Sequence, residues 1–246
     1  MQNNVHDATG DSRVVAEWYY IDADSGGETS VITSATRKGN WIQTATGKQF
    51  WPLDPRSEDV SLEDIACSLS KFPRFLSHVA PEVEPYFIAQ HTVYVSLVAE
   101  EIAPSALKDL CALWGLHHDD HEAYRGDELS PIKGAGVVIG GVPLDSIELA
   151  IDKAIATALL LPNFSRPVRD IVALADARAL ATEKRDLMSP EPAQWGLVVA
   201  PFPFKLVPVP WRVAKRDYLA RHADLMQRVL GSTLADFGGG TSGATD

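Results

Sequence analysis

Cysteine is scarce in this chain, with two residues among 246. Cys67 and Cys111 both fall in apolar segments of helical pattern, so we expect reduced core thiols in a cytoplasmic protein and no disulfide framework. Long apolar runs are also missing: the longest, residues 154–161, is far shorter than the roughly 20 residues that a spanning helix needs. The start of the sequence shows no basic segment ahead of an apolar one. We therefore expect neither a membrane anchor nor a secretion signal.

Basic residues are outnumbered, because 22 Lys and Arg stand against 33 Asp and Glu and give a net charge of −11. Nucleic acids and anionic membranes attract positive surfaces, so this balance argues against stable nucleic-acid binding and against a membrane partner. An anionic ligand would have to be attracted locally. Arg74 and Lys133 are candidate bases for that, although either base alone is more typical of a solvated surface charge.

What the chain does contain is a dense polar cluster, His-His-Asp-Asp-His-Glu, at residues 117–122. Apolar residues recur near the helical period over residues 106–116, which predicts one helix from residue 105 to 124. On such a helix, His118 and Glu122 would lie one turn apart on the same face.

Imidazole and carboxylate side chains are ordinary ligands for zinc, manganese, iron and cobalt. The adjacent pair of His118 and Asp119 is therefore a candidate ligand pair, although a His-Asp dipeptide alone is a weak signal. Further ligands would have to come from elsewhere in the fold. The candidates on apolar-periodic segments are His91, Asp152 and Asp176.

The order of elements expected from the sequence begins with β structure and continues with helices. Residues 14–21 have the pattern of a strand, and residues 41–44 and 49–51 flank a Gly-containing turn that predicts a hairpin. Ser61 is expected to begin a helix as its N-cap, with Asp64 completing an approximate capping box. The other helices are expected at residues 87–101, 105–124, 144–161, 166–188 and 213–230, with a glycine-containing loop at 134–141 and a proline-rich passage at 190–210.

A longer series of short matches runs from Trp41 to Met188. These matches are Trp41-Ile42-Gln43-Thr44, Thr46-Gly47-Lys48, Pro52-Leu53-Asp54-Pro55, Glu63-Asp64-Ile65-Ala66, Arg74-Phe75, His78, Ala89-Gln90-His91, His118-Asp119, Glu122-Ala123-Tyr124, Gly126-Asp127, Pro131, Lys133, Ala175-Asp176-Ala177-Arg178, Ala181-Thr182-Glu183 and Arg185-Asp186-Leu187-Met188. On these residues the chain resembles the HD-domain phosphohydrolases, in the branch that holds 5'-deoxynucleotidases and phage dATP triphosphohydrolases.

The resemblance implies a mainly α fold, an HD-domain helical bundle with a small N-terminal β appendage or hairpin. Residues 1–40 would be a β extension outside the resemblance, residues 41–232 the phosphohydrolase domain, and residues 233–246 a flexible tail. The resemblance also implies a divalent transition metal, either zinc, cobalt, manganese or iron.

The implied metal ligands are His91, His118, Asp119 and Asp176. Asp176 is preferred to Asp152 because the family's last aspartate lies in an Ala-Asp-x-x-Leu context, from which residues 175–180 differ by one place. Asp152 matches a different acidic position and is assigned to substrate binding.

Other roles also follow from the resemblance. Glu122 and Asp127 are the catalytic candidates, to orient the attacking water or to protonate the departing 5'-oxygen, and the sequence does not say which does which. Arg74 is expected to bind phosphate, with Phe75 on the sugar or base, although Phe75 could equally be a core residue. The remaining expected substrate contacts are His78, Lys133 and Asp152. We interpret His117 and His121 as supporting residues and His222 as exposed.

The expected function is hydrolysis of a deoxynucleoside monophosphate or triphosphate, including dATP, with release of the deoxynucleoside. The alternatives are a catalytically inactive nucleotide sensor and a metal-dependent phosphodiesterase. We expect a homo-oligomer, and residues 202–211 are either an interface arm or a segment that covers the protein's own core.

Overall fold

The computed structural model describes residues 37–238, and the expected strand at residues 14–21 lies outside them. The described chain is mainly helical, as predicted. In order, its elements are β1 (Ile42–Gln43), β2 (Gln49–Phe50), η1 (Ser57–Asp59), α1 (Leu62–Leu69), η2 (Arg74–Ser77), α2 (Ile88–Ile102), α3 (Lys108–His117), α4 (Glu122–Arg125), α5 (Ser130–Lys133), β3 (Val138–Ile139), β4 (Val142–Pro143), α6 (Leu144–Ala158), α7 (Arg166–Leu187) and α8 (Trp211–Gly238). None of these helices combines the length and apolar character needed to cross a membrane.

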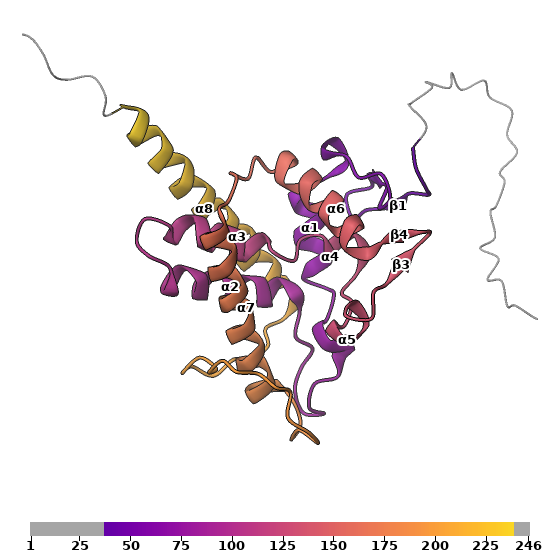
Figure 1. The fold of residues 1–246 in the computed structure, drawn as a ribbon, viewed down its shortest axis with the longest axis vertical. Helices are drawn as coiled ribbons and strands as arrows, with labels where there is room; N and C mark the ends of the chain where they lie inside the picture. The colour runs from indigo at the N-terminus through magenta and orange to yellow at the C-terminus, as the bar shows by residue number, and fades with distance from the viewer. Residues whose placement is uncertain (1–36, 239–246) are drawn as a thin grey trace, which may run out of the picture. The chain divides into compact units, whose positions relative to one another are not determined.

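Two short antiparallel hairpins supply the β structure (Figure 1). The first, β1 with β2, confirms the predicted hairpin. The second, β3 with β4, lies where only a loop was expected. Gly140 and Gly141 both adopt positive φ between these strands, which suits the tight two-residue turns of hairpins. Strands of two residues are too short to leave an alternating pattern in the sequence.

The expected helix from residue 105 to 124 is wrong, because α3 ends at His117 and α4 begins at Glu122. Residues 118–121 form a turn between them. Short polar side chains that bond back to nearby groups compete with helix formation. Here Asp120 accepts a hydrogen bond from Nδ1 of His117 at 2.6 Å, and Nδ1 of His118 donates to the Gly115 carbonyl at 2.8 Å.

The start of α1 also differs from expectation. Ser61 occupies the N-cap position, but its side chain makes no capping hydrogen bond. Asp64 instead accepts hydrogen bonds from the backbone N–H of Thr46, at 2.6 Å, and from its hydroxyl, at 2.8 Å. The predicted capping box is therefore wrong, and the Asp64 carboxylate joins the first hairpin to α1.

Helix α2 packs against α3, α7 and α8 (Figure 1). The contact with α3 is close, because a Cβ atom added to Gly115 would lie 3.0 Å from Cα of Ser96. The Ser96 hydroxyl donates to the Ala112 carbonyl across the same contact at 2.7 Å. This close approach brings the rings of His91 and His118 to a centroid separation of 5.3 Å.

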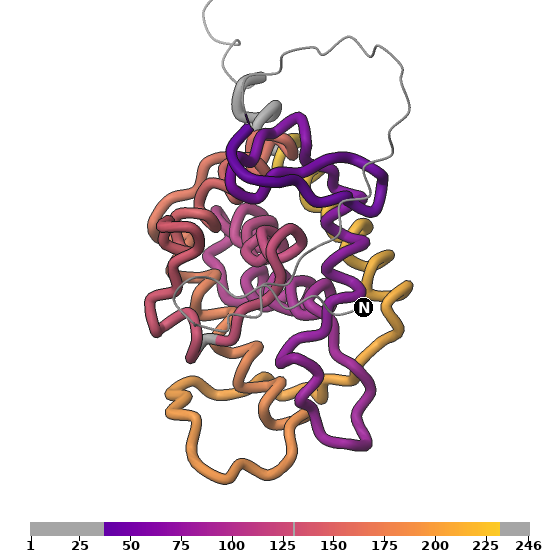
Figure 2. The backbone as a smooth tube through the Cα atoms, turned by 90° about the vertical axis from the view of Figure 1, so that its right-hand side faces the viewer, coloured from indigo at the N-terminus to yellow at the C-terminus, as the bar shows by residue number. Residues whose placement is uncertain are grey.

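The proline-rich passage after α7 is shown in orange in Figure 2, where it runs out from α7 and returns to α8. The side chain of Gln90 donates to the Val207 carbonyl and accepts from the Val209 N–H. Phe202 and Leu206 are buried. Residues 202–211 therefore cover part of the protein's own core, and the interface role of this segment stays a prediction. The last helix, α8, continues to Gly238, so the start of the expected tail is helical.

Candidate metal centre

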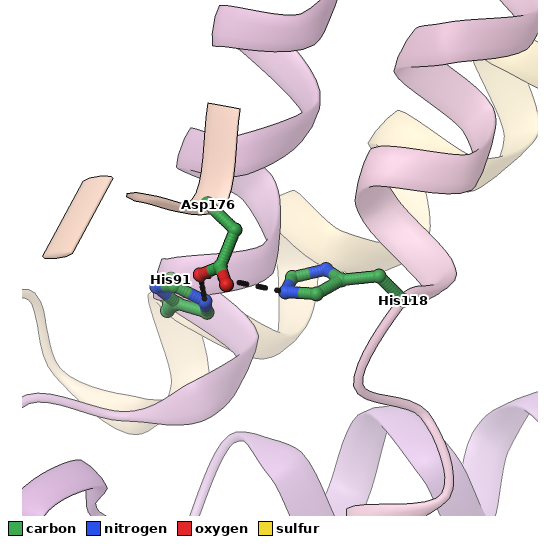
Figure 3. A group of neighbouring side chains, drawn as sticks. All are labelled: His91, His118 and Asp176. Carbon is green, nitrogen blue, oxygen red and sulfur yellow. Dashed lines mark ion pairs between the residues drawn. The ribbon is translucent and has the colours of Figure 1, made fainter. Parts of the chain in front are cut away.

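The four predicted metal ligands come together from three parts of the fold. His91 lies near the start of α2, His118 and Asp119 lie in the turn after α3, and Asp176 lies midway along α7. Nε2 of His91 is 3.2 Å from Asp176 Oδ1 and 3.6 Å from Asp119 Oδ2. Nε2 of His118 is 3.2 Å from Asp119 Oδ2 and 3.8 Å from Asp176 Oδ1. Figure 3 shows both imidazoles directed toward the Asp176 carboxylate.

Both imidazoles are held by their other ring nitrogen. Nδ1 of His91 donates to Glu183 Oε1 at 2.6 Å, and Nδ1 of His118 donates to the Gly115 carbonyl. Both Nε2 atoms are buried and have no hydrogen-bond partner. Metal-bound histidines typically donate their second N–H to a carboxylate or a carbonyl. His91, His118 and Asp176 are therefore positioned to hold a metal ion, with their ligand atoms within 4.8 Å of one another.

The carboxylates around the imidazoles change their proton affinity. Burial opposes protonation of His118, but Asp119 and Asp176 outweigh it and raise the pKa of His118 to about 10. Burial likewise opposes protonation of His91, and Glu183 and Asp176 raise its pKa above the ordinary value. Despite burial, His118 holds the pKa of Asp119 well below its usual range. A cation would replace the protons on these nitrogens, so any metal ion held by the cluster would bind in competition with protons.

Arg74 lies beside the cluster, as predicted for a phosphate-binding residue. Its NH1 is 3.5 Å from Asp119 Oδ2, and its Nε is 3.4 Å from Glu183 Oε2. Glu183 is fully buried and holds both Arg74 and His91. Sequence reasoning assigned no role to Glu183. The available signal was its spacing of seven residues from Asp176, about two helical turns, which puts both carboxylates on one face of α7.

Next to Arg74 the backbone is strained. Phe75, Leu76 and Ser77 have φ values of 56°, 50° and 62°, a left-handed conformation that is costly for residues with a Cβ. Phe75 is half-buried: its ring lies 5.3 Å from the Arg74 guanidinium and also packs against the apolar cluster of Tyr86, Leu187 and Leu206, so both interpretations of Phe75 stay open. His78 is exposed at the end of this segment, and among the described residues its imidazole makes no hydrogen bond or ion pair.

The catalytic candidates lie close to the cluster. Glu122 is buried, and burial together with the Asp119 and Asp127 carboxylates raises the pKa of Glu122 to about 9. Lys133 Nζ is 3.8 Å from Glu122 Oε1 and 3.4 Å from Glu148 Oε1. The structure therefore brings the expected acids and the expected base together at the start of α4.

Asp152 lies on α6 and takes no part in the group of His91, His118 and Asp176. Its Oδ1 accepts a hydrogen bond from Nδ1 of His121 at 3.0 Å. This placement agrees with the preference for Asp176 as the metal ligand. It also connects Asp152 to the site through a histidine.

No protein family model matches the chain. The chain is 32% identical over 194 residues to the uncharacterized protein YfdR of Escherichia coli strain K12, covering 76% of this chain and 97% of YfdR. It is also 27% identical over 154 residues to an uncharacterized protein of Rhodobacter capsulatus, covering 61% of this chain and 74% of that protein. The match to YfdR extends over nearly its whole length, and the chain therefore belongs to the same family as YfdR.

Proposed function

We propose that this protein is an HD-domain, metal-dependent phosphohydrolase that releases deoxynucleosides from 2'-deoxynucleotides. The observation that carries the proposal is the pair of buried Nε2 atoms of His91 and His118, neither of which makes a hydrogen bond. Each lies within 3.2–3.8 Å of the Asp119 and Asp176 carboxylates, beside Arg74. Buried polar atoms normally form hydrogen bonds, so ligand-type atoms that converge without forming them favour a metal site. The resemblance described above supplies the reaction class.

His91, His118, Asp119 and Asp176 would hold the metal ion. A divalent ion held there would lower the pKa of a bound water molecule and polarise a phosphoryl oxygen. Arg74 carries a permanent, forked charge at the edge of the cluster, which suits it to bind phosphate oxygens. Its pairing with the fully buried Glu183 keeps the guanidinium oriented before substrate arrives.

Proton transfer falls to Glu122 or Asp127. A carboxyl group whose pKa is raised to about 9 is protonated at neutral pH and can donate a proton to the departing 5'-oxygen. A bound cation beside Asp119 would lower that pKa again. The raised value therefore applies to the metal-free protein, and both residues remain candidates for the role.

Both a monophosphate and a triphosphate suit this arrangement. Lys133, next to Glu122, is the candidate contact for phosphate, and the Phe75 ring, next to Arg74, is the candidate contact for the sugar or base. His78 and Asp152 are weaker candidates, because His78 is exposed and Asp152 is hydrogen-bonded to His121.

We also propose that the protein is cytoplasmic and forms a homo-oligomer. The free thiols of Cys67 and Cys111 are consistent with the cytoplasmic location.

A product screen tests the proposal. Purified protein loaded with Zn²⁺, Co²⁺, Mn²⁺ or Fe²⁺ is incubated with dNMPs, dNTPs, NMPs and a cyclic dinucleotide, and products are separated by chromatography and ³¹P NMR. Deoxynucleoside with phosphate indicates a nucleotidase, and deoxynucleoside with triphosphate indicates a triphosphohydrolase. Cleavage of the cyclic dinucleotide alone indicates a phosphodiesterase. Nucleotide binding without any turnover indicates a sensor. The Asp176→Ala protein is the control for contaminating activity.

Deoxyribose should be preferred over ribose. The resemblance implies a sugar site that packs too closely for a 2'-hydroxyl, and a hydroxyl without a partner costs free energy on burial. We expect kcat/KM for dAMP, or for dATP, to exceed that for the ribonucleotide by at least about tenfold. Equal values for the two sugars would contradict this expectation.

A further inference from the structure

A second group of ligand-type side chains lies next to the first. Asp119, His121 and Glu122 bring their ligand atoms within 4.8 Å of one another. His121 and Glu122 are buried, with 6% and 3% of their surfaces exposed. They belong to the turn after α3 and to the first position of α4. The premature end of α3 is what lets Asp119 and His121 contribute to the same group.

The orientation of His121 repeats the orientation of the two histidines in the first group. Its Nδ1 donates to Asp152 Oδ1 at 3.0 Å, and its Nε2 is buried, makes no hydrogen bond and lies 3.9 Å from Glu148 Oε2. In the first group, His91 is held in the same way by Glu183. A carboxylate that fixes one ring nitrogen and leaves the other without a hydrogen bond is the arrangement expected of a metal-binding histidine.

Glu122 provides an independent observation. Its Oε2 atom is buried and also has no hydrogen-bond partner. Lys133 Nζ lies 3.8 Å from the other oxygen, Oε1, and it is shared with Glu148 Oε1 at 3.4 Å. A buried carboxylate oxygen without a partner is expensive unless a cation or a donor reaches it.

We propose that Asp119, His121 and Glu122 bind a second divalent cation, with the Asp119 carboxylate shared between this cation and the one held by His91, His118 and Asp176. The inference extends the proposed metal-dependent function. One imidazole and two carboxylates suit Mn²⁺, Fe²⁺, Co²⁺ or Zn²⁺ better than Ca²⁺, which prefers oxygen ligands alone.

Two cations that share a carboxylate can hold the attacking and the departing oxygens of a phosphoryl transfer. This arrangement changes two earlier interpretations. His121, expected to be a supporting residue, is a ligand, and Asp152 is the residue that orients it. Glu122 is a ligand and stays ionised when the second cation is bound, which leaves Asp127 as the proton donor.

Metal stoichiometry tests the proposal without reference to turnover. Tag-free, full-length protein is stripped with a chelator and dialysed against Mn²⁺, and bound manganese is counted by mass spectrometry. We expect two ions per wild-type chain, with an EPR spectrum showing exchange coupling between them. His121→Ala should bind one ion and lose the coupling. His78→Ala removes an exposed imidazole outside both groups and should still bind two.

One bound ion in both the wild-type protein and the His121→Ala variant would overturn the second site. Two bound ions in every variant would place the second ion elsewhere and would also overturn it. If circular dichroism shows that His121→Ala is unfolded, the nearly isosteric Glu122→Gln variant decides by the same count. Two coupled ions without phosphohydrolase activity would support the second site and contradict the proposed function, so the two failures are distinguishable.

Discussion

The side chains of residues 117–122 belong to two networks, which differ in whether their polar atoms hydrogen-bond to one another. His117 and Asp120 enter a closed network against α8, whereas His118 and Asp119 face the open metal cluster. The residue types are the same in both. The two networks differ in the hydrogen-bond partners of their polar atoms. This difference separates a structural His-Asp pair from a candidate catalytic one.

In the closed network, both ring nitrogens of His117 and both carboxylate oxygens of Asp120 have hydrogen-bond partners. His117 Nδ1 donates to Asp120 Oδ2 at 2.6 Å, and its Nε2 lies 2.9 Å from Nδ1 of His222. The Tyr218 hydroxyl donates to Asp120 Oδ1 at 2.6 Å. His222 was expected to be exposed, but it is half-buried against His117, so that prediction is wrong.

In the candidate metal cluster, the Nε2 atoms of His91 and His118 are buried and lie 3.2–3.8 Å from carboxylates, but neither makes a hydrogen bond. Buried polar groups normally have partners, and exceptions need a reason. A missing ligand is such a reason. Side chains that hydrogen-bond to one another add stability and specificity, while ligand-type side chains that converge without hydrogen bonds are candidates for binding.

The largest effect that separates the two networks should come from Asp176→Ala. Loss of a charged ligand removes both metal affinity and water activation, so we expect the ion shared by His91 and His118 to be lost together with essentially all metal-dependent turnover. Asp152→Asn is the matched control, because it removes a carboxylate that holds His121 and touches neither of those histidines. It should retain that ion, as metal analysis can show. A metal-free Asp152→Asn beside a loaded Asp176→Ala would refute the ligand assignment.

The sequence was sufficient for part of this picture. The apolar period of α2 and α7 located both helices to within about one residue, and the resemblance selected four ligand-type residues that the structure brings together. The break between α3 and α4 was missed because it depends on side-chain bonds of His118 and Asp120 that a helical pattern does not reveal. For the same reason, which histidine faces which network could not be predicted.

Glu183→Gln should give the next largest effect. The substitution keeps the side-chain shape but removes the charge that holds His91 and Arg74, so metal affinity should fall about 10- to 100-fold. Arg74 would remain buried next to a neutral partner, which should lower the free energy of unfolding by up to about 3 kcal/mol. Titration with Mn²⁺ and urea unfolding measure the two effects. Unchanged metal affinity would contradict a positioning role for Glu183.

Asp120→Asn tests the closed network. An amide cannot accept from both His117 and Tyr218 as the carboxylate does, so we expect a loss of about 2 kcal/mol in the free energy of unfolding. The number of bound metal ions should stay the same as in the wild-type protein, because Asp120 bonds to His117 and Tyr218 and to none of the proposed metal ligands. Loss of a metal ion from a folded Asp120→Asn protein would show that the two networks are coupled.

The smallest effect should appear in the dependence of stability on pH. Burial and the neighbouring His117 lower the pKa of His222 to about 4, below its ordinary value of 6.5. Between these two values the unfolded chain binds more protons than the folded chain, so stability falls as the pH falls from about 6.5 to 4. Because His222 is partly exposed, we expect its contribution to be roughly 1 kcal/mol and not the full amount implied by the shift.

His222→Gln removes this titration while retaining a hydrogen-bonding side chain. Urea unfolding of the variant and the wild-type protein at pH 7 and pH 4.5 gives the difference directly, and contributions from His91 and His118 cancel because both proteins carry them. The stability deficit of the variant should be larger at pH 7 than at pH 4.5, since the wild-type protein alone loses the His222 contribution on acidification. A stability deficit that grows toward low pH would mean that His222 is protonated in the folded state. The pKa of His222 would then be raised, as the pKa values of His91 and His118 are.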